Sequence, residues 1–258
     1  MRQAGSGGVR SGRRPVRRVV SLVPSLTEAV AESAPELLVG VTDWCSHPVG
    51  LAAPRIGGTK NPRVAEIVRL APDLVLANEE ENRAPDLDAL RAAGLRVRET
   101  RVRSLPEAFA ELDSVLTADC GLPRPGWLDE AESAWAALPG AGPRRSVAAV
   151  APVWRRPWIV LGRDTFAGDL LHRLGVRNQW AEEEERYPRI ALDRLLAARP
   201  ELVVLPDEPY RFTASDGPEA FPGVPSALVS GRHLTWYGPS LAEAPAVLGE
   251  QLAAARVR

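Results

Sequence analysis

Short apolar runs alternate with segments of helical period along the first hundred residues. Apolar runs bounded by turn residues predict buried strands, and apolar positions three and four apart predict helices. The predicted strands are residues 17–23, 37–42, 73–77 and 95–99. Three helices are predicted between them. The first begins at Pro24, where Ser25 and Glu28 have the spacing of a capping box. The second has apolar residues at Val64, Ile67, Val68 and Ala71, and the third spans 85–93. This alternation predicts a parallel, doubly wound sheet.

The pattern changes after residue 100. Residues 105–118 and 126–138 have helical periods with no strand between them. A second series follows, with predicted strands at 146–150, 158–161, 201–205 and 226–229 and helices at 164–174, 190–198 and from about 240. We therefore predict an α/β fold of two Rossmann-like lobes joined by helix. A ligand cleft is expected between them, at the carboxyl ends of the strands.

Four segments follow from this organisation. Residues 1–15 are predicted to be a disordered basic tail, 16–118 the N-terminal α/β lobe, 119–143 the connecting helix and 144–258 the C-terminal α/β lobe. The tail lacks the apolar stretch of a secretory signal, which predicts a cytoplasmic protein. A misassigned start codon would instead place the protein in the periplasm or outside the cell.

Composition narrows the functional classes. Apolar residues make up 45% and charged residues 25%, and the formal net charge is −1, so no nucleic-acid-binding surface is expected. No stretch approaches the roughly 20 apolar residues of a spanning helix, which excludes direct membrane insertion. Lys60 is the sole lysine in the sequence. Three of the four asparagines lie with it in the 23-residue segment 60–82. These rare residues direct attention to one part of the first lobe.

The loop after the second predicted strand contains Trp44, Cys45 and His47. Thiol and imidazole groups suit zinc, copper or iron, so Cys45 and His47 are candidate metal ligands. Asp43 adds a carboxylate in the same segment, but no CxxC, HExxH or histidine cluster supplies the further ligands that a metal ion requires. The alternative is that Cys45 packs as a small apolar side chain and His47 bonds to the backbone.

Lys60 follows a glycine pair and stands just before a predicted helix, where free N–H groups favour an anionic ligand. The charged segment 78–83 lies at the end of a neighbouring strand. We expect an acid of this segment to pair with Lys60 across the floor of the first lobe. The alternatives are a solvated lysine and a solvated acidic patch.

In the second lobe, aromatic and charged residues lie at the predicted strand ends. Aromatic side chains there would hold a flat or macrocyclic ligand by stacking, unless Trp236 and Tyr237 cap the core. Asp164 is also a candidate N-cap, and residues 182–185 are expected to be a solvated loop. The candidate ligand-binding residues are Trp44, Cys45, His47, Thr59, Lys60, Asn61, Asn78, Glu79, Glu80, Asn82, Arg83, Arg163, Asp164, Glu208, Tyr210, Trp236 and Tyr237.

Residues 18–28, 39–42, 55–58 and 66–77 carry a resemblance to a known family. They resemble the iron-siderophore and cobalamin receptors, or helical-backbone metal receptors, of the class III periplasmic-binding-protein fold. The resemblance implies two lobes joined by a long rigid helix, here 126–138, with little hinge motion. Segments 44–48, 58–62, 78–83 and 234–238 especially resemble a soluble branch described as cobalamin-binding proteins.

Three functions are therefore considered. The first is a non-catalytic protein that holds a corrinoid or a metal chelate in the cleft. The second is a metal-dependent enzyme derived from this fold, using Cys45, His47 and cleft carboxylates. The third is the substrate-binding protein of an ABC transporter, with a permease as partner. The resemblance implies docking through an exposed acid on each lobe. This sequence departs from that pattern, with Ala65 near the first position, beside Glu66, and Gly238-Pro239 near the second. No nucleophile elbow, dinucleotide fingerprint or kinase signature is present.

Overall fold

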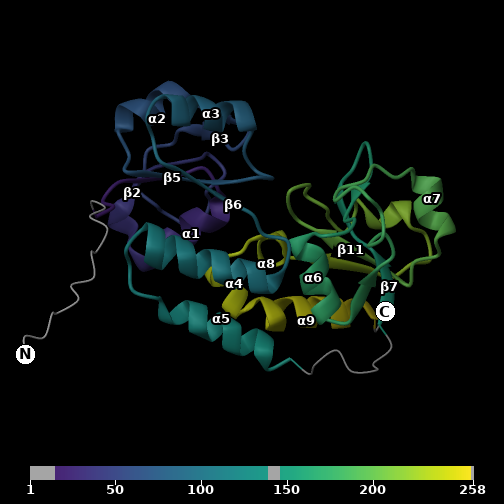
Figure 1. The fold of residues 1–258 in the computed structure, drawn as a ribbon. Helices are drawn as coiled ribbons and strands as arrows, with labels where there is room; N and C mark the ends of the chain where they lie inside the picture. The colour runs from purple at the N-terminus through teal and green to yellow at the C-terminus, as the bar shows by residue number, and fades with distance from the viewer. Residues whose placement is uncertain (1–14, 139–145, 257–258) are drawn as a thin grey trace, which may run out of the picture.

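The computed structural model describes residues 15–138 and 146–256, and it has two α/β lobes side by side (Figure 1). Residues 1–14 of the predicted basic tail lie outside the described residues. No helix in the described ranges is long and apolar enough to cross a membrane. The α/β class and the two lobes predicted from the sequence are confirmed.

Lobe 1 is built on a parallel sheet in the order β2-β1-β5-β6. Its strands are β1 (Val19–Ser21), β2 (Leu38–Val41), β5 (Leu74–Asn78) and β6 (Val97–Thr100). Helices α2 (Val64–Leu70) and α3 (Ala84–Ala92) pack together over one face of the sheet (Figure 1). Val20, Ile67, Val75 and Leu87 form the small core under them, because central strands covered on both faces need apolar residues on both.

Lobe 2 repeats this plan with a parallel sheet in the order β10-β7-β11-β12. Its strands are β7 (Val147–Val150), β10 (Val176–Asn178), β11 (Leu202–Pro206) and β12 (Ser226–Val229). A small hairpin, β8 (Pro152–Trp154) and β9 (Ile159–Val160), precedes α6 (Phe166–Arg173). The later helices are α7 (Leu192–Ala197), α8 (Gly231–Thr235) and α9 (Ala244–Arg256). The three-residue strand β10 and the short helix α8 were not predicted, because so few residues show no period.

Two helical segments lie between the sheets of the two lobes, where the sequence predicted helices at 105–118 and 126–138. The first is α4 (Leu105–Asp113), continued by a π-helix (Ser114–Asp119), and the second is α5 (Gly126–Ala136). The Leu105 N–H donates to Asp169 of lobe 2 at 2.8 Å, while Asp119 pairs with Arg98 of lobe 1 at 2.9 Å. The first segment therefore contacts both lobes, and the exact lobe boundaries stay predictions.

The α5 helix also contacts both lobes. Its Trp127 indole N–H donates to Ser33 of α1 (Pro24–Ser33), at 3.2 Å. Its Trp135 indole N–H donates to the Leu241 carbonyl at 3.0 Å. The largest apolar cluster runs from β1 and α1 through α4 and α5 to α6 and α9, so the two lobes share one core. A shared core fits the little hinge motion that the resemblance implies.

Two predicted helix caps are wrong. The α1 helix has Val23 at its N-cap and Pro24 in its first turn, so Ser25 lies inside the helix and the capping box does not form. The buried Glu28 instead pairs with Arg232 of lobe 2. At α6 the N-cap is Thr165, and Asp164 has a left-handed backbone with φ of 52°.

Candidate ligand-binding site between the lobes

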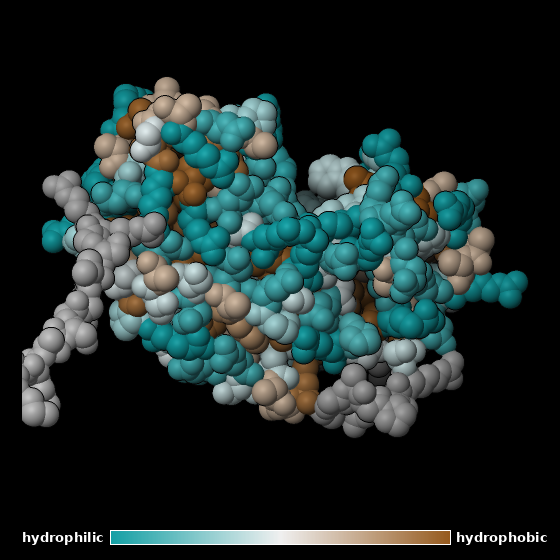
Figure 2. All heavy atoms as spheres, in the orientation of Figure 1, coloured by the Kyte–Doolittle hydropathy of each residue, from teal (hydrophilic) through white to brown (hydrophobic). Residues whose placement is uncertain are grey.

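The strand ends of the two sheets face each other across the cleft that the sequence predicted. The outline of the molecule is notched between the lobes, and polar side chains cover much of this face (Figure 2). Tyr237 of lobe 2 bonds through its hydroxyl to the Thr100 hydroxyl at the end of β6, at 3.1 Å. His47 of lobe 1 lies edge-on to Trp236, with ring centroids 5.5 Å apart. The end of β6, the loop after β2 and the segment after α8 therefore meet between the lobes.

The loop after β5 is held in shape by two buried asparagines. The Asn78 side-chain oxygen accepts the backbone N–H of Glu80 at 2.8 Å. Asn82 accepts the backbone N–H of Asn78 at 2.9 Å and donates to the carbonyls of Leu22 and Thr59. These bonds fix the loop and position its acids, and ligand contact by Asn78 and Asn82 stays a prediction.

Lys60 lies beside this loop, as the sequence predicted, but its partner differs. Its ammonium donates to the backbone carbonyl of Glu80, and no described carboxylate forms an ion pair with it. The expected Lys60–acid pair is therefore replaced by a lysine–carbonyl bond. Thr59 is buried and its carbonyl accepts from Asn82 at 3.0 Å. The short hairpin of β3 (Gly57–Gly58) and β4 (Asn61–Pro62) is thus tied to the loop after β5.

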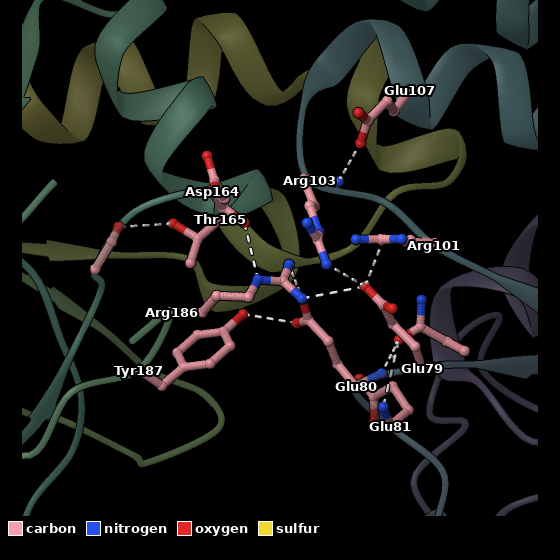
Figure 3. A network of polar contacts seen from close by, with 12 residues as sticks. Glu79, Glu80, Glu81, Arg101, Arg103, Glu107, Asp164, Thr165, Arg186 and Tyr187 are labelled. Carbon is pink, nitrogen blue, oxygen red and sulfur yellow. Dashed lines mark hydrogen bonds and ion pairs between the residues drawn. The ribbon is translucent and has the colours of Figure 1, made fainter. Parts of the chain in front are cut away.

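Glu79 and Glu80 are the centre of a polar network that crosses the cleft (Figure 3). Glu79 accepts from Arg101 and Arg103, each at 3.4 Å, and from Arg186 of lobe 2 at 3.2 Å. Glu80 pairs with Arg186 and accepts from the Tyr187 hydroxyl at 2.7 Å. The carboxylates of Glu79 and Glu80 therefore reach lobe 2, a contact that the sequence did not predict.

The sequence analysis missed the arginines and the tyrosine of this network. Arg101 and Arg103 directly follow β6, so their place at a strand end was a usable signal. Arg186 and Tyr187 follow the acidic run 182–185, which was predicted to be a solvated loop, and nothing local to the sequence shows that their side chains reach lobe 1.

The other end of the cleft contains a pocket of about 320 Å³. Its lining comes from both lobes and consists of His47, Asp207, Glu208, Ser230, Arg232 and His233. Arg232 joins the lobes here through Glu28. His233 is held between the Ser230 hydroxyl at 2.7 Å and Glu243 at 2.9 Å. Because Ser230 is also the N-cap of α8, these bonds fix the wall of the pocket.

Burial changes the protonation of the cleft residues. It raises the pKa of Glu208 to about 7, with further contributions from the charges of Asp207 and Glu81. The pKa of Glu81 is also raised by burial, although Lys60 opposes the shift. Burial and Arg232 lower the pKa of His47. The pocket thus offers a neutral imidazole at His47 and a partly protonated carboxyl at Glu208, which both donate and accept hydrogen bonds.

The predicted aromatic residues have different environments. Trp236 and Tyr237 are buried, so they pack the lobes together and cap the core. Tyr210 packs within lobe 2, where its hydroxyl donates to Asp216 at 2.6 Å. Trp44 is 67% exposed beside Gly58, close to the loop after β5. Among these aromatic side chains, Trp44 is the one with an open ring for stacking.

The metal-binding hypothesis gains no support from the geometry. The Cys45 thiol is buried and bonded to the Thr27 and Thr42 hydroxyls at 3.0 and 3.1 Å. Burial raises its pKa, which disfavours the thiolate that binds metals. The described residues contain no group of three histidine, cysteine or acidic side chains placed to hold a metal ion.

The remaining candidates lie at the edges of the cleft. Asn61 is exposed on β4, and Arg83 pairs with Asp86 along α3 at 3.6 Å. Arg163 and Asp164 are exposed and lie 3.9 Å apart. The Asp164 carbonyl accepts from Arg186 at 2.9 Å, so this residue supports the network through its backbone. Ligand contacts by these four residues stay predictions.

Sequence comparison finds distant relatives, and no protein-family model matches the chain. A vitamin B12-binding protein of Vibrio cholerae is 21% identical over 193 residues, which is 73% of this chain and 70% of the relative. The protein of the same name from Vibrio parahaemolyticus is 22% identical over the same shares. One from Vibrio vulnificus is 30% identical over 95 residues, covering 36% of this chain and 35% of the relative.

Solved structures show the same architecture. The periplasmic vitamin B12-binding protein BtuF of Vibrio cholerae has a TM-score of 0.70 at 18% identity, over 95% of this chain and 99% of its own. The periplasmic heme-binding protein BhuT, in complex with two hemes, has a TM-score of 0.73 at 22% identity, over 92% and 98%. Helicobacter pylori CeuE with bound Ni(II) has 0.77 at 13% identity, over 93% and 84%.

These neighbours share a fold with two α/β lobes, and this chain has the class III periplasmic-binding-protein fold. The resemblance inferred from the sequence is confirmed. The predicted cytoplasmic location is not supported, since the BtuF and BhuT structures are of periplasmic proteins.

Proposed function

We propose that this protein is a non-catalytic binding protein that holds a macrocyclic or metal-chelate ligand between its lobes. The observation that carries this proposal is the cleft itself, where loops at the strand ends of both sheets meet around the His47–Glu208 pocket. Parallel α/β sheets bind ligands at these ends. The V. cholerae relative, matched over 73% of this chain, is named for binding vitamin B12.

A corrinoid is the first ligand to test. Its peripheral amides both donate and accept hydrogen bonds, and the pocket combines groups of both kinds, with Glu208 titrating at a pKa of about 7. The exposed ring of Trp44 stands nearby on lobe 1 and offers a flat apolar surface. Heme is the second ligand to test, because BhuT is named for binding it.

Titration of the protein with cyanocobalamin and with hemin, followed by absorbance and calorimetry, tests the proposal. We expect one of the two to bind with a stoichiometry of one or two. The Trp44→Ala variant should bind about five- to tenfold more weakly, since an aromatic contact contributes roughly 1 kcal/mol. Val49→Ala is the matched control, because Val49 is an exposed apolar residue of the same loop. Binding of neither probe, with no chromophore co-purifying, would reject this ligand class.

A role in transport extends the same proposal. We infer a location outside the cytoplasm and an ABC permease as partner, in line with the periplasmic neighbours. Glu66, which the resemblance places near a docking position, pairs with Arg63 at 2.6 Å on the surface of α2. Surface ion pairs of this kind break at low cost, so Glu66 remains available to a partner. Fractionation of the producing cells tests the location.

A further inference from the structure

The two lobes are bridged by ion pairs at both ends of the cleft, and the two bridges differ. In each bridge an arginine of lobe 2 meets acids of lobe 1. The Glu28–Arg232 bridge is largely buried, since the Glu28 side chain is 6% exposed. In the other bridge, the side chains of Glu79, Glu80 and Arg186 are 21% to 30% exposed. The acids of this second bridge are therefore more open to water and salt than Glu28, while the contacting atoms Glu80 Oε1 and Arg186 Nη2 are buried.

The lobe 2 side of the exposed bridge is a fixed strap. The Gly162 N–H donates to the Arg186 carbonyl at 2.8 Å, and the Val160 N–H donates to the Pro188 carbonyl at 3.1 Å. A Cβ atom at Gly162 would lie 2.1 Å from the Glu185 carbonyl oxygen, so the strap passes directly over this glycine. The backbone of residues 185–188 is thus held in place, while the Arg186 and Tyr187 side chains project toward lobe 1 (Figure 3).

The lobe 1 side has one anchored and one exchangeable acid. Glu79 keeps two partners of its own lobe, Arg101 and Arg103, whether or not Arg186 is present. Within the described ranges, the partners of the Glu80 carboxylate are Arg186 and Tyr187, both on lobe 2. Separation of the lobes at this end therefore breaks every described side-chain contact of Glu80 but leaves Glu79 paired.

We propose that Glu79, Glu80, Arg186 and Tyr187 form a clamp that closes the β5 end of the cleft and that must open before a ligand enters there. The Glu28–Arg232 bridge and the shared core act as the fixed end. The proposal rests on the proposed function only for the kind of ligand that enters when the clamp opens. Its closing and opening can be measured without any ligand.

Distances between spin labels on the two lobes test the clamp. Ala89→Cys on α3 and Ala197→Cys on α7 provide exposed sites. The native Cys45 and Cys120 are buried, and the parent protein must take up no label. We expect a narrow distribution of label distances when the clamp residues are unchanged. Glu80→Gln and the double variant Arg186→Gln/Tyr187→Phe should broaden it toward longer distances.

Controls separate the clamp from general loosening. Arg189→Gln removes an exposed arginine three residues along and should leave the distribution unchanged. Raising the salt concentration to 1 M should broaden it in the parent but not in Arg186→Gln/Tyr187→Phe. A distribution that is the same in Glu80→Gln as in the parent overturns the proposal.

Association kinetics give a second measurement, with cyanocobalamin and hemin as the probes. Release of partly exposed ion pairs should speed association of the probe that binds by about two- to fivefold, because a larger fraction of the protein is open. Arg189→Gln should again match the parent. If neither probe binds, the proposed function fails while the label distances still decide the clamp. Equal association rates in the parent and in Glu80→Gln would contradict the clamp.

Discussion

At the scale of single residues, the cleft is characterised by acids whose surroundings oppose their charge. Glu208 has its pKa raised to about 7 by burial and by the neighbouring charges of Asp207 and Glu81, with Arg232 opposing the shift. One of its carboxylate oxygens is buried with no described partner. This arrangement disfavours ionised Glu208 and makes it a hydrogen-bond donor over much of the physiological pH range.

The raised pKa of Glu208 predicts a specific pH dependence of stability. The unfolded carboxyl has a pKa near 4.5, so between about 4.5 and 7 the folded protein holds a proton that the unfolded chain has lost. Its contribution to stability is present at pH 4 and is lost as the pH rises through 7. The unfolding free energy of Glu208→Gln, relative to that of the parent, should therefore rise by roughly 1–2 kcal/mol from pH 5 to pH 8, a figure reduced for the partial exposure of the side chain.

Denaturant unfolding of the parent and of Glu208→Gln at pH 5 and at pH 8 measures this difference in unfolding free energy. Glu250→Gln, a change of an exposed acid on α9, is the matched control and should follow the parent at both values. If the gap between parent and Glu208→Gln is the same at pH 5 and pH 8, the carboxyl is not held in its protonated form.

At the scale of elements, short irregular segments decide the site while the regular strands and helices support it. The strap over Gly162 and the loop after β5 carry the groups that cross the cleft. Both are fixed by local bonds, the first through the Gly162 and Val160 backbone and the second through Asn78 and Asn82. A substitution at such an anchor should act on the site from a distance.

Gly162→Ala is the clearest test of the strap. Its new Cβ would lie 2.1 Å from the Glu185 carbonyl oxygen and 2.9 Å from the Pro188 side chain, so the strap must shift. We expect a loss of about 1–3 kcal/mol in unfolding free energy, the usual cost of overpacking. Gly249→Ala, in the open middle of α9, should instead stabilise by about 0.5–1 kcal/mol. A Gly162→Ala variant as stable as the parent would contradict this account of the strap.

At the scale of the whole molecule, one apolar cluster joins the two lobes. It contains residues of β1, α1, α4, α5, α6 and α9, and the Glu28–Arg232 pair adds a buried polar bridge. Lobes that share a core lose packing on both sides when either one unfolds. They are therefore expected to behave as one cooperative unit, in which motion is limited to the clamped end of the cleft.

Calorimetry tests this cooperativity. A single thermal transition is expected, with equal calorimetric and van't Hoff enthalpies. The intrinsic fluorescence of the seven tryptophans, which lie in both lobes and in α5, should report the same midpoint. Two resolved transitions would show that the lobes unfold separately, and the shared core would then not couple them.

The sequence by itself determined the α/β class, the two lobes and most of the strands. These follow from local apolar runs and from helical periods that survive without tertiary context, as at β5 and β12. It also located Glu79 and Glu80 at a strand end that faces the other lobe. The buried surroundings of Cys45, Trp236 and Tyr237 were left open, because an apolar side chain suits a core and a binding surface equally well.

Only the tertiary structure decided which groups meet across the cleft. Arg186 and Glu79 are 107 residues apart in sequence, and Arg232 and Glu28 are 204 apart, so no local pattern pairs them. The same holds for the lysine that drew attention first, since whether Lys60 meets a carboxylate or a carbonyl depends on the path of the loop after β5. The sequence determines the charge of each side chain, but the packing of the two lobes determines which partner that side chain meets.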